Sequence, residues 1–323
     1  CAILEAAKEA CIPIEAAVTV AIVEEESQRC GGEDERYAVE AVKLCEPSNK
    51  LVKQHSIVRL TPAQLVQDHS RPVIEALQLW GYMETRNSLI ISAGLAECHR
   101  LGLTHVLTGD NADELWGGSY DIMMDNNRYK DDPEGWKAKR DGMADLPFVT
   151  EKLGAMYGIT ILQPLVDWAV RETTRSDCID NTKCCAIQSK WGGPWQVQNC
   201  GKLPLREAFA TVASWRRMDW IFRGSTAQEG RILLEYYNAI ISDEEFQREQ
   251  ASYKEHKGVV LPTKEHLHNI RIFESLHGGK LQHPTKERFA VGDPRGCVAC
   301  CFDIGDEQFC HLCDQYPAQH PKK

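Results

Sequence analysis

Apolar runs alternate with amphipathic segments along the N-terminal third of the chain. Residues 16–23 form a continuous apolar run rich in β-branched residues, which is typical of a parallel strand buried on both faces. Two more short strands are expected over 55–60 and 104–108. Apolar residues at helical spacing predict the intervening helices, over residues 1–12, 33–46, 62–79 (interrupted at Pro72) and 88–101. This alternation favours a parallel sheet with helices on both faces.

The strand signal fades after Gly118, and we expect the second half of the chain to be mostly helical. Apolar spacing predicts helices over 146–157 and 227–240, and another that opens at Gly201. Residues 243–290 are rich in Lys, Glu and His, and we predict that they form a peripheral helical or linker segment.

The C-terminal segment carries four cysteines in two closely spaced pairs. Two residues separate Cys297 from Cys300, two separate Cys310 from Cys313, and nine lie between the pairs. Each pair can grip one tetrahedral metal ion, and four thiolates complete a structural Zn²⁺ site. A tail this short cannot hold a hydrophobic core, so we expect it to be unfolded without its metal. The alternative is a disordered tail with unliganded thiols.

Together these patterns predict an α/β fold. A Rossmann-like parallel sheet flanked by helices is followed by a mostly helical half and a small cysteine-rich zinc tail. The predicted divisions are 1–240, 241–292 and 293–323.

Composition narrows the possible partners and compartments. Fourteen cysteines scattered over 323 residues favour a reducing compartment over a secreted disulfide framework, so we expect a cytoplasmic protein. The net charge of −10 makes nucleic acid an unlikely partner for the chain as a whole. The sequence contains no run of 18 apolar residues that would predict a membrane span, and no signal peptide is visible.

The segment with the clearest chemical character is Thr104–Gly118, which reads THVLTGDNADELWGG. An apolar strand runs here into a turn of glycine and carboxylates. In open α/β folds, ligands bind at the carboxyl ends of the strands. Backbone amides there can hold phosphate oxygens, and carboxylates can hold the accompanying Mg²⁺. The alternative is a tight acidic turn that only caps a helix.

Four segments in this order resemble the synthetase domain of glutamine-dependent asparagine synthetases, which belongs to the ATP-pyrophosphatase superfamily. They are TGDNADELWGG at 108–118, PLVD at 164–167, GKLPLREAF at 201–209 and WRRMDW at 215–220. The resemblance covers about residues 1–238. It implies an ATP-dependent ligase that activates a substrate carboxylate as an acyl-adenylate. Ammonia then displaces AMP to form an amide, and pyrophosphate is the other product.

The resemblance also implies which residues bind the nucleotide and its metal. Val20 matches the strand residue beside the adenine, and Thr108 and Gly109 match the ATP-binding Ser-Gly pair. Asp113 matches a carboxylate that binds Mg²⁺.

Two residues match positions that act on the acyl-adenylate or the pyrophosphate, and Arg217 is a cation next to a third such position. Asp110 stands where the family has a glutamate that handles the acyl-adenylate. Lys202 and Arg217 are the cations that would offset charge on the leaving pyrophosphate. The chain departs from the family at Asn111, where the family has glycine, and at Met218, where it has lysine.

The family also has a Ser-Gly-Gly-x-Asp-Ser turn that would lie just upstream of Cys1. We therefore expect an N-terminally truncated chain that binds ATP poorly as it stands. The implied partners are an amino-acid carboxylate substrate and a glutaminase domain or subunit that supplies ammonia. Two alternatives stay open: a tRNA-modifying or sulfur-transfer ATP pyrophosphatase, and a degenerate, non-catalytic protein that uses zinc for interactions.

Overall fold

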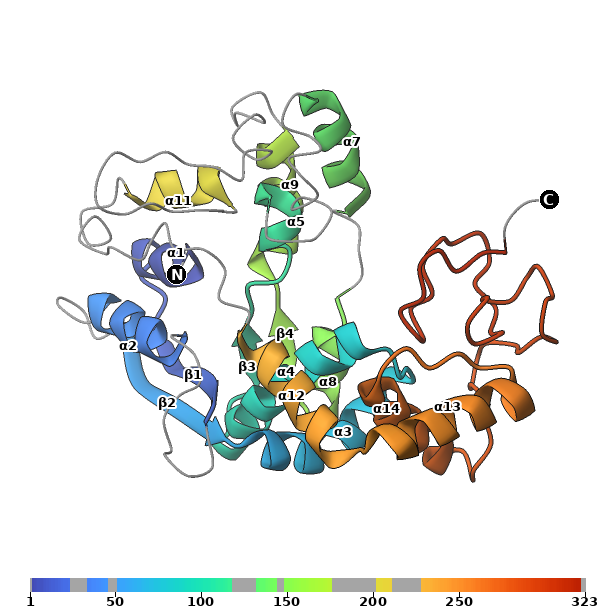
Figure 1. The fold of residues 1–323 in the computed structure, drawn as a ribbon. Helices are drawn as coiled ribbons and strands as arrows, with labels where there is room; N and C mark the ends of the chain where they lie inside the picture. The colour runs from blue at the N-terminus through green and yellow to red at the C-terminus, as the bar shows by residue number, and fades with distance from the viewer. Residues whose placement is uncertain are drawn as a thin grey trace, which may run out of the picture.

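The computed structural model describes residues 2–23, 34–45, 51–117, 132–143, 148–175, 202–210 and 228–320 (Figure 1). Within these ranges the protein is a mixed α/β structure in which helices predominate and the strands form two two-stranded parallel sheets. None of the described helices is both long enough and apolar enough to cross a membrane.

The first sheet pairs two long strands and is covered by helices on both faces. β1 (Ile14–Ile22) runs parallel to β2 (Val52–Leu60). The helices α1 (Ala2–Glu9) and α2 (Asp34–Cys45) pack on one face through a small apolar cluster. The other face packs against α4 (Tyr82–Arg100). The predicted parallel pairing and two-sided helical cover are confirmed for this sheet, although β2 begins at Val52 rather than near residue 55.

The second sheet is shorter. β3 (His105–Leu107) pairs in parallel with β4 (Thr160–Leu162). Val106 and Ile161 point into the main core, where α8 (Thr150–Met156) packs against β4. The side chains of Leu107 and Leu162, which lie opposite one another, are 40% and 42% exposed.

The helices that follow β2 differ from their predicted limits. α3 (Pro62–Leu77) begins with a capping box in which Thr61 and Gln64 bond each other's backbone. The helix continues through Pro72 because neighbouring apolar residues are fully buried, so the predicted interruption is wrong. α4 starts at Tyr82 rather than near residue 88. Its first turns bury polar residues such as Thr85 and therefore lack the apolar spacing that predicts a helix.

One helix of the segment predicted to be peripheral, α14 (Lys264–Leu276), lies at the centre of the helical part, whereas α13 (Asp243–Lys257) is largely exposed as predicted. α12 (Gln228–Ile240) and α13 lead into α14. α14 packs against α3, α4, α12 and α13 (Figure 1). Three of its apolar side chains are completely buried: Leu267, Ile270 and Phe273.

One buried cluster extends from Ile22 to Ala318 and crosses the predicted divisions at 240 and 292. The C-terminal tail therefore contributes to the same core as the helices. The remaining described elements are α5 (Ala112–Trp116), α7 (Pro133–Met143), η1 (Pro164–Val166), α9 (Trp168–Arg175) and α11 (Leu203–Ala210).

The contact between α8 and β4 allows a direct test of the core. A Cβ atom at Gly154 would lie 2.6 Å from Ile161 Cγ1 and 2.8 Å from the carbonyl oxygen of Ile159. We expect Gly154→Ala to lower the free energy of unfolding by about 1–3 kcal/mol because the helix must move away from the strand. Urea unfolding followed by circular dichroism measures this change.

Gly142 in α7 is the matched control. It is exposed, and a Cβ atom there would meet nothing within 4 Å. Gly142→Ala should leave stability unchanged or raise it by up to about 1 kcal/mol through helix propensity. Equal effects of the two substitutions would contradict the close packing of α8 on β4.

Candidate functional site

The four predicted cysteine ligands of the tail come together in the structure. Their Sγ atoms all lie within 4.8 Å of one another. Cys297 Sγ lies 3.8 Å from Cys313 Sγ, and Cys300 Sγ lies 3.6 Å from Cys310 Sγ. Four sulfurs placed tetrahedrally at the usual Zn–S distance of about 2.3 Å would be about 3.8 Å apart. The spacing of these donors therefore fits a metal ion such as zinc.

Each cysteine pair lies on the same kind of backbone turn. The amide of Cys301 donates to the carbonyl oxygen of Cys297 at 2.9 Å, and the amide of Asp314 donates to that of Cys310 at 2.8 Å. Cys301 and Asp314, which follow the second cysteine of each pair, have left-handed φ values of 66° and 59°. We call these two turns the knuckles. The repeated geometry aims both sulfurs of each knuckle at one point.

The sulfurs of the cysteine cluster are buried close together. All four ligands are at most 4% exposed. Hydrogen bonds from the neighbouring thiols lower the pKa of Cys297, whereas hydrogen bonding to Cys297 raises the pKa of Cys300 well above its usual value. Four buried thiolates would repel one another strongly, and a divalent ion would offset that repulsion.

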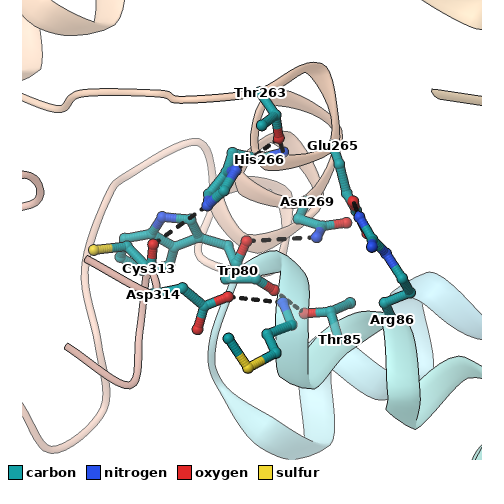
Figure 2. Close-up of polar contacts among 11 residues, drawn as sticks. Trp80, Thr85, Arg86, Thr263, Glu265, His266, Asn269, Cys313 and Asp314 are labelled. Carbon is teal, nitrogen blue, oxygen red and sulfur yellow. Dashed lines mark hydrogen bonds and ion pairs between the residues drawn. The ribbon is translucent and has the colours of Figure 1, made fainter. Parts of the chain in front are cut away.

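The second knuckle is bonded directly to the connection between α3 and α4 (Figure 2). The carbonyl oxygen of Leu312 accepts from the amides of Trp80 at 2.9 Å and Gly81 at 2.8 Å. The carboxylate of Asp314 accepts from the amide of Met83 at 2.7 Å. The sequence gives no signal for these contacts, because they join residues more than two hundred positions apart.

A buried histidine holds the same knuckle from the side of α14. Burial lowers the pKa of His266 to about 4, so its imidazole is neutral at pH 7. Its Nε2 donates to the carbonyl oxygen of Cys313 at 3.3 Å, and Nδ1 contacts the hydroxyl of Thr263 at 2.8 Å (Figure 2). His266 is therefore a positioning residue that lies outside the four-sulfur set.

The acidic turn after β3 forms a second candidate site. Asp110 Oδ2 accepts from Thr108 Oγ1 at 2.7 Å and from Gln163 Nε2 at 2.8 Å. The amide of Thr108 donates to the carbonyl oxygen of Leu162, so the turn begins where the two short strands end. Gln163 was missed by sequence reasoning, although it immediately precedes the PLVD segment.

Asn111 connects the acidic turn to the PLVD segment. It lies just before α5 with a φ of 74° and is 1% exposed. Its Nδ2 donates to the carbonyl oxygen of Leu165 at 3.2 Å, while its Oδ1 has no hydrogen-bond partner among the described residues. Asparagine tolerates this left-handed conformation better than most residues.

Asp113 and Lys202 form an ion pair next to this turn. Lys202 Nζ lies 2.8 Å from Asp113 Oδ2, and the amide of Lys202 donates to the carbonyl oxygen of Gly117. Behind them, Leu115 and Trp116 pack with Leu165, Leu205 and other apolar side chains. The segments 108–117, 164–167 and 202–209 therefore meet around α5.

Of the other predicted nucleotide residues, Val20 is not part of this group, whereas Gly109 is. Val20 lies in β1 and packs toward α4, since a Cβ atom at Gly94 would lie 3.5 Å from its Cγ2. Gly109 lies in the turn, and a Cβ atom there would meet nothing within 4 Å. Arg217 and Met218 lie outside the described residues, as does Gly118.

Glu84 lies in the first turn of α4 and was also missed by sequence reasoning. Burial raises its pKa, and the negative charges of Asp314 and Asp110 raise it further. This carboxyl group in the first turn of α4 is thus electrostatically coupled both to a knuckle and to the acidic turn.

The metal-binding capacity of the cluster can be measured directly. We expect about one zinc ion per chain, and loss of that ion in Cys300→Ser, because a hydroxyl is a much weaker zinc ligand than a thiolate. Elemental analysis of the purified protein gives the stoichiometry. Cys98→Ser is the matched control, since Cys98 is also buried but lies in α4 outside the cluster. Unchanged zinc content in Cys300→Ser would exclude the four-sulfur site.

Comparison with known proteins adds no family assignment. No protein-family model matches this chain, and no curated protein matches it. Function must therefore be inferred from the cysteine cluster and the acidic turn themselves.

Proposed function

We propose that the chain is an asparagine-synthetase-like ligase domain that uses ATP to activate an amino-acid carboxylate. The observation that carries this proposal is the convergence of three segments around α5: 108–117, 164–167 and 202–209. These segments are far apart in the sequence and were matched to the family independently of their positions in space. The three segments meet at the ends of two parallel strands, which is where an open α/β fold binds ligands.

In the proposed reaction the substrate carboxylate attacks the α-phosphorus of ATP, and pyrophosphate leaves. Ammonia then displaces AMP from the acyl-adenylate, and a glutaminase domain or subunit supplies that ammonia. Asp110 would orient the acyl-adenylate. Hydrogen bonds from Thr108 and Gln163 would hold the Asp110 carboxylate in place. Lys202 and Arg217 would offset the charge of the leaving pyrophosphate.

Asp113 is the proposed magnesium ligand. Mg²⁺ bound with a nucleotide needs only one or two protein carboxylates, since phosphates and water complete its shell. The ion would neutralise phosphate charge during the transfer. Asp113 is half-buried and paired with Lys202, which suits this role. When the metal and the phosphates bind, Asp113 would bind the metal ion and Lys202 would bind a phosphate.

We also propose that the two parallel strand pairs belong to one Rossmann-like sheet. Val20 of β1 and Ile161 of β4 belong to the same apolar core, which α3, α4 and α8 build. Short parallel sheets are rarely stable alone and are usually buried on both faces. The exposed Leu107 and Leu162 fit a sheet that is more extensive than the described strands.

In this proposal the tail carries a structural Zn²⁺ ion in a reducing, cytoplasmic setting. The seven cysteines whose side chains the structure describes are free thiols, which suits both a reducing compartment and thiolate ligation.

A non-catalytic, zinc-dependent interaction protein is the second candidate. It is favoured by the fact that Asp110 and Asp113 both have polar partners within the protein. An acidic turn satisfied in this way could have only a structural role.

ATP–pyrophosphate exchange distinguishes the two candidates. On the native protein with aspartate, we expect exchange that falls roughly 100-fold in Asp113→Asn, because magnesium binding and charge neutralisation are lost. The Asp113–Lys202 pair is about a third exposed, so the same substitution should change the free energy of unfolding by less than about 1 kcal/mol.

Asp293→Asn supplies the control for this test. Asp293 also forms an ion pair, with Arg295 at 2.8 Å, but it lies in the tail away from the turn. It should leave exchange unchanged. Absence of exchange with aspartate and with every other amino acid tested would rule out the ligase and favour the interaction protein.

A further inference from the structure

The N-terminus of α4 has no cap from its own sequence. Its N-cap residue is Gly81, which has no side chain that could accept a backbone hydrogen bond. The first turn of a helix leaves several amides without intrahelical partners. Here the Asp314 carboxylate accepts from the amide of Met83, and the Thr85 hydroxyl donates to the carbonyl oxygen of Gly81 (Figure 2). The cap is thus supplied by the residue that follows the last cysteine of the cluster.

Asp314 and Gly81 are fitted to one another. Asp314 has a left-handed φ of 59°, a conformation in which glycine would be less strained. A Cβ atom at Gly81 would lie 2.5 Å from the Asp314 carboxyl group. Position 314 therefore carries a side chain although its backbone conformation favours glycine. Position 81 is glycine although most helices have a capping side chain at the N-cap.

The first knuckle makes the corresponding contact at the end of α13. Cys301 has a φ of 66°, and its Sγ donates to the carbonyl oxygen of Gly258 at 3.5 Å. Gly258 is the C-cap residue of α13. Next to it, the amide of Val260 donates to the carbonyl oxygen of Ala299 at 2.8 Å. Cys301 and Asp314, the last residues of the two knuckles, thus each contact one helix end.

We propose that the metal-bound tail is a clamp on these two helix ends. Asp314 fixes the start of α4, Cys301 fixes the end of α13, and metal occupancy keeps both in position. The metal fixes the backbone conformation of each knuckle, and that conformation positions Cys301 in the first knuckle and Asp314 in the second. This clamp is independent of the ligase chemistry proposed above, and it gives the tail a second role beyond holding its own fold.

The clamp can transmit metal occupancy to the acidic turn. α4 packs against β1 and α8, and its C-terminal end leads through residues 101–104 into β3. β3 in turn ends at Thr108, where the acidic turn begins. Loosening the first turn of α4 therefore loosens a helix that both strand pairs depend on.

Hydrogen exchange on the full chain tests the clamp. We expect Asp314→Gly to retain its zinc, since glycine suits the left-handed knuckle, while peptides covering residues 80–86 exchange roughly ten-fold faster. Cys301→Gly is the matched variant at the other knuckle. It should also retain zinc, leave 80–86 unchanged and speed exchange over 258–261.

Two further measurements guard against simple misfolding. Removing zinc from the native chain with a chelator should speed exchange at both helix ends while leaving the β1 peptide 14–22 unchanged. Gly81→Ala should reproduce the Asp314→Gly result and add nothing when the two are combined, because both break the same contact. Identical exchange over 80–86 with and without zinc would overturn the clamp. Additive effects of Gly81→Ala and Asp314→Gly would overturn it as well.

Discussion

Most of the described structure depends on the contacts made by the buried residue Trp80. It is 0% exposed and lies between an aromatic side chain of α14 and one of the tail. Its ring centroid is 4.8 Å from that of Phe273 and 5.7 Å from that of Phe302. Its backbone amide donates to Leu312, and its carbonyl oxygen accepts from Asn269 (Figure 2). One residue in a short connection thus ties together three parts of the chain that are distant in sequence.

This arrangement makes the cysteine cluster part of the core. A free-standing zinc tail would keep its thiols near solvent and use the metal only to fold itself. Here Cys297 and Cys300 are completely buried in the same cluster as Trp80 and Phe302. If a metal ion binds this cluster, its loss would leave unpaired thiolates in an apolar setting, so they would take up protons and the local packing would have to change. The stability of the helical part and the occupancy of the cluster are therefore physically linked.

Short stretches of sequence were sufficient to predict the elements that are stabilised by residues close to one another in the chain. The β-branched run of β1 and the two cysteine pairs were both visible in short windows. The start of α4 was not, because its first turn is stabilised by Asp314 from the far end of the chain. The burial of α14 was missed for a related reason: its polar residues, such as Asn269, are paired with partners that only the folded chain brings near.

The acidic turn illustrates how far residue identity can carry a functional interpretation. Lys202 has a φ of 58°, although lysine, unlike asparagine, has no short side chain to ease the left-handed conformation. A residue that served only to lead into α11 would be less strained as glycine. Lysine is explained if its ammonium group is needed beside Asp113, where it now lies 2.8 Å from the carboxylate. Backbone strain that holds a cation against a carboxylate, at the ends of two parallel strands, favours a site for anionic ligands over a purely structural turn.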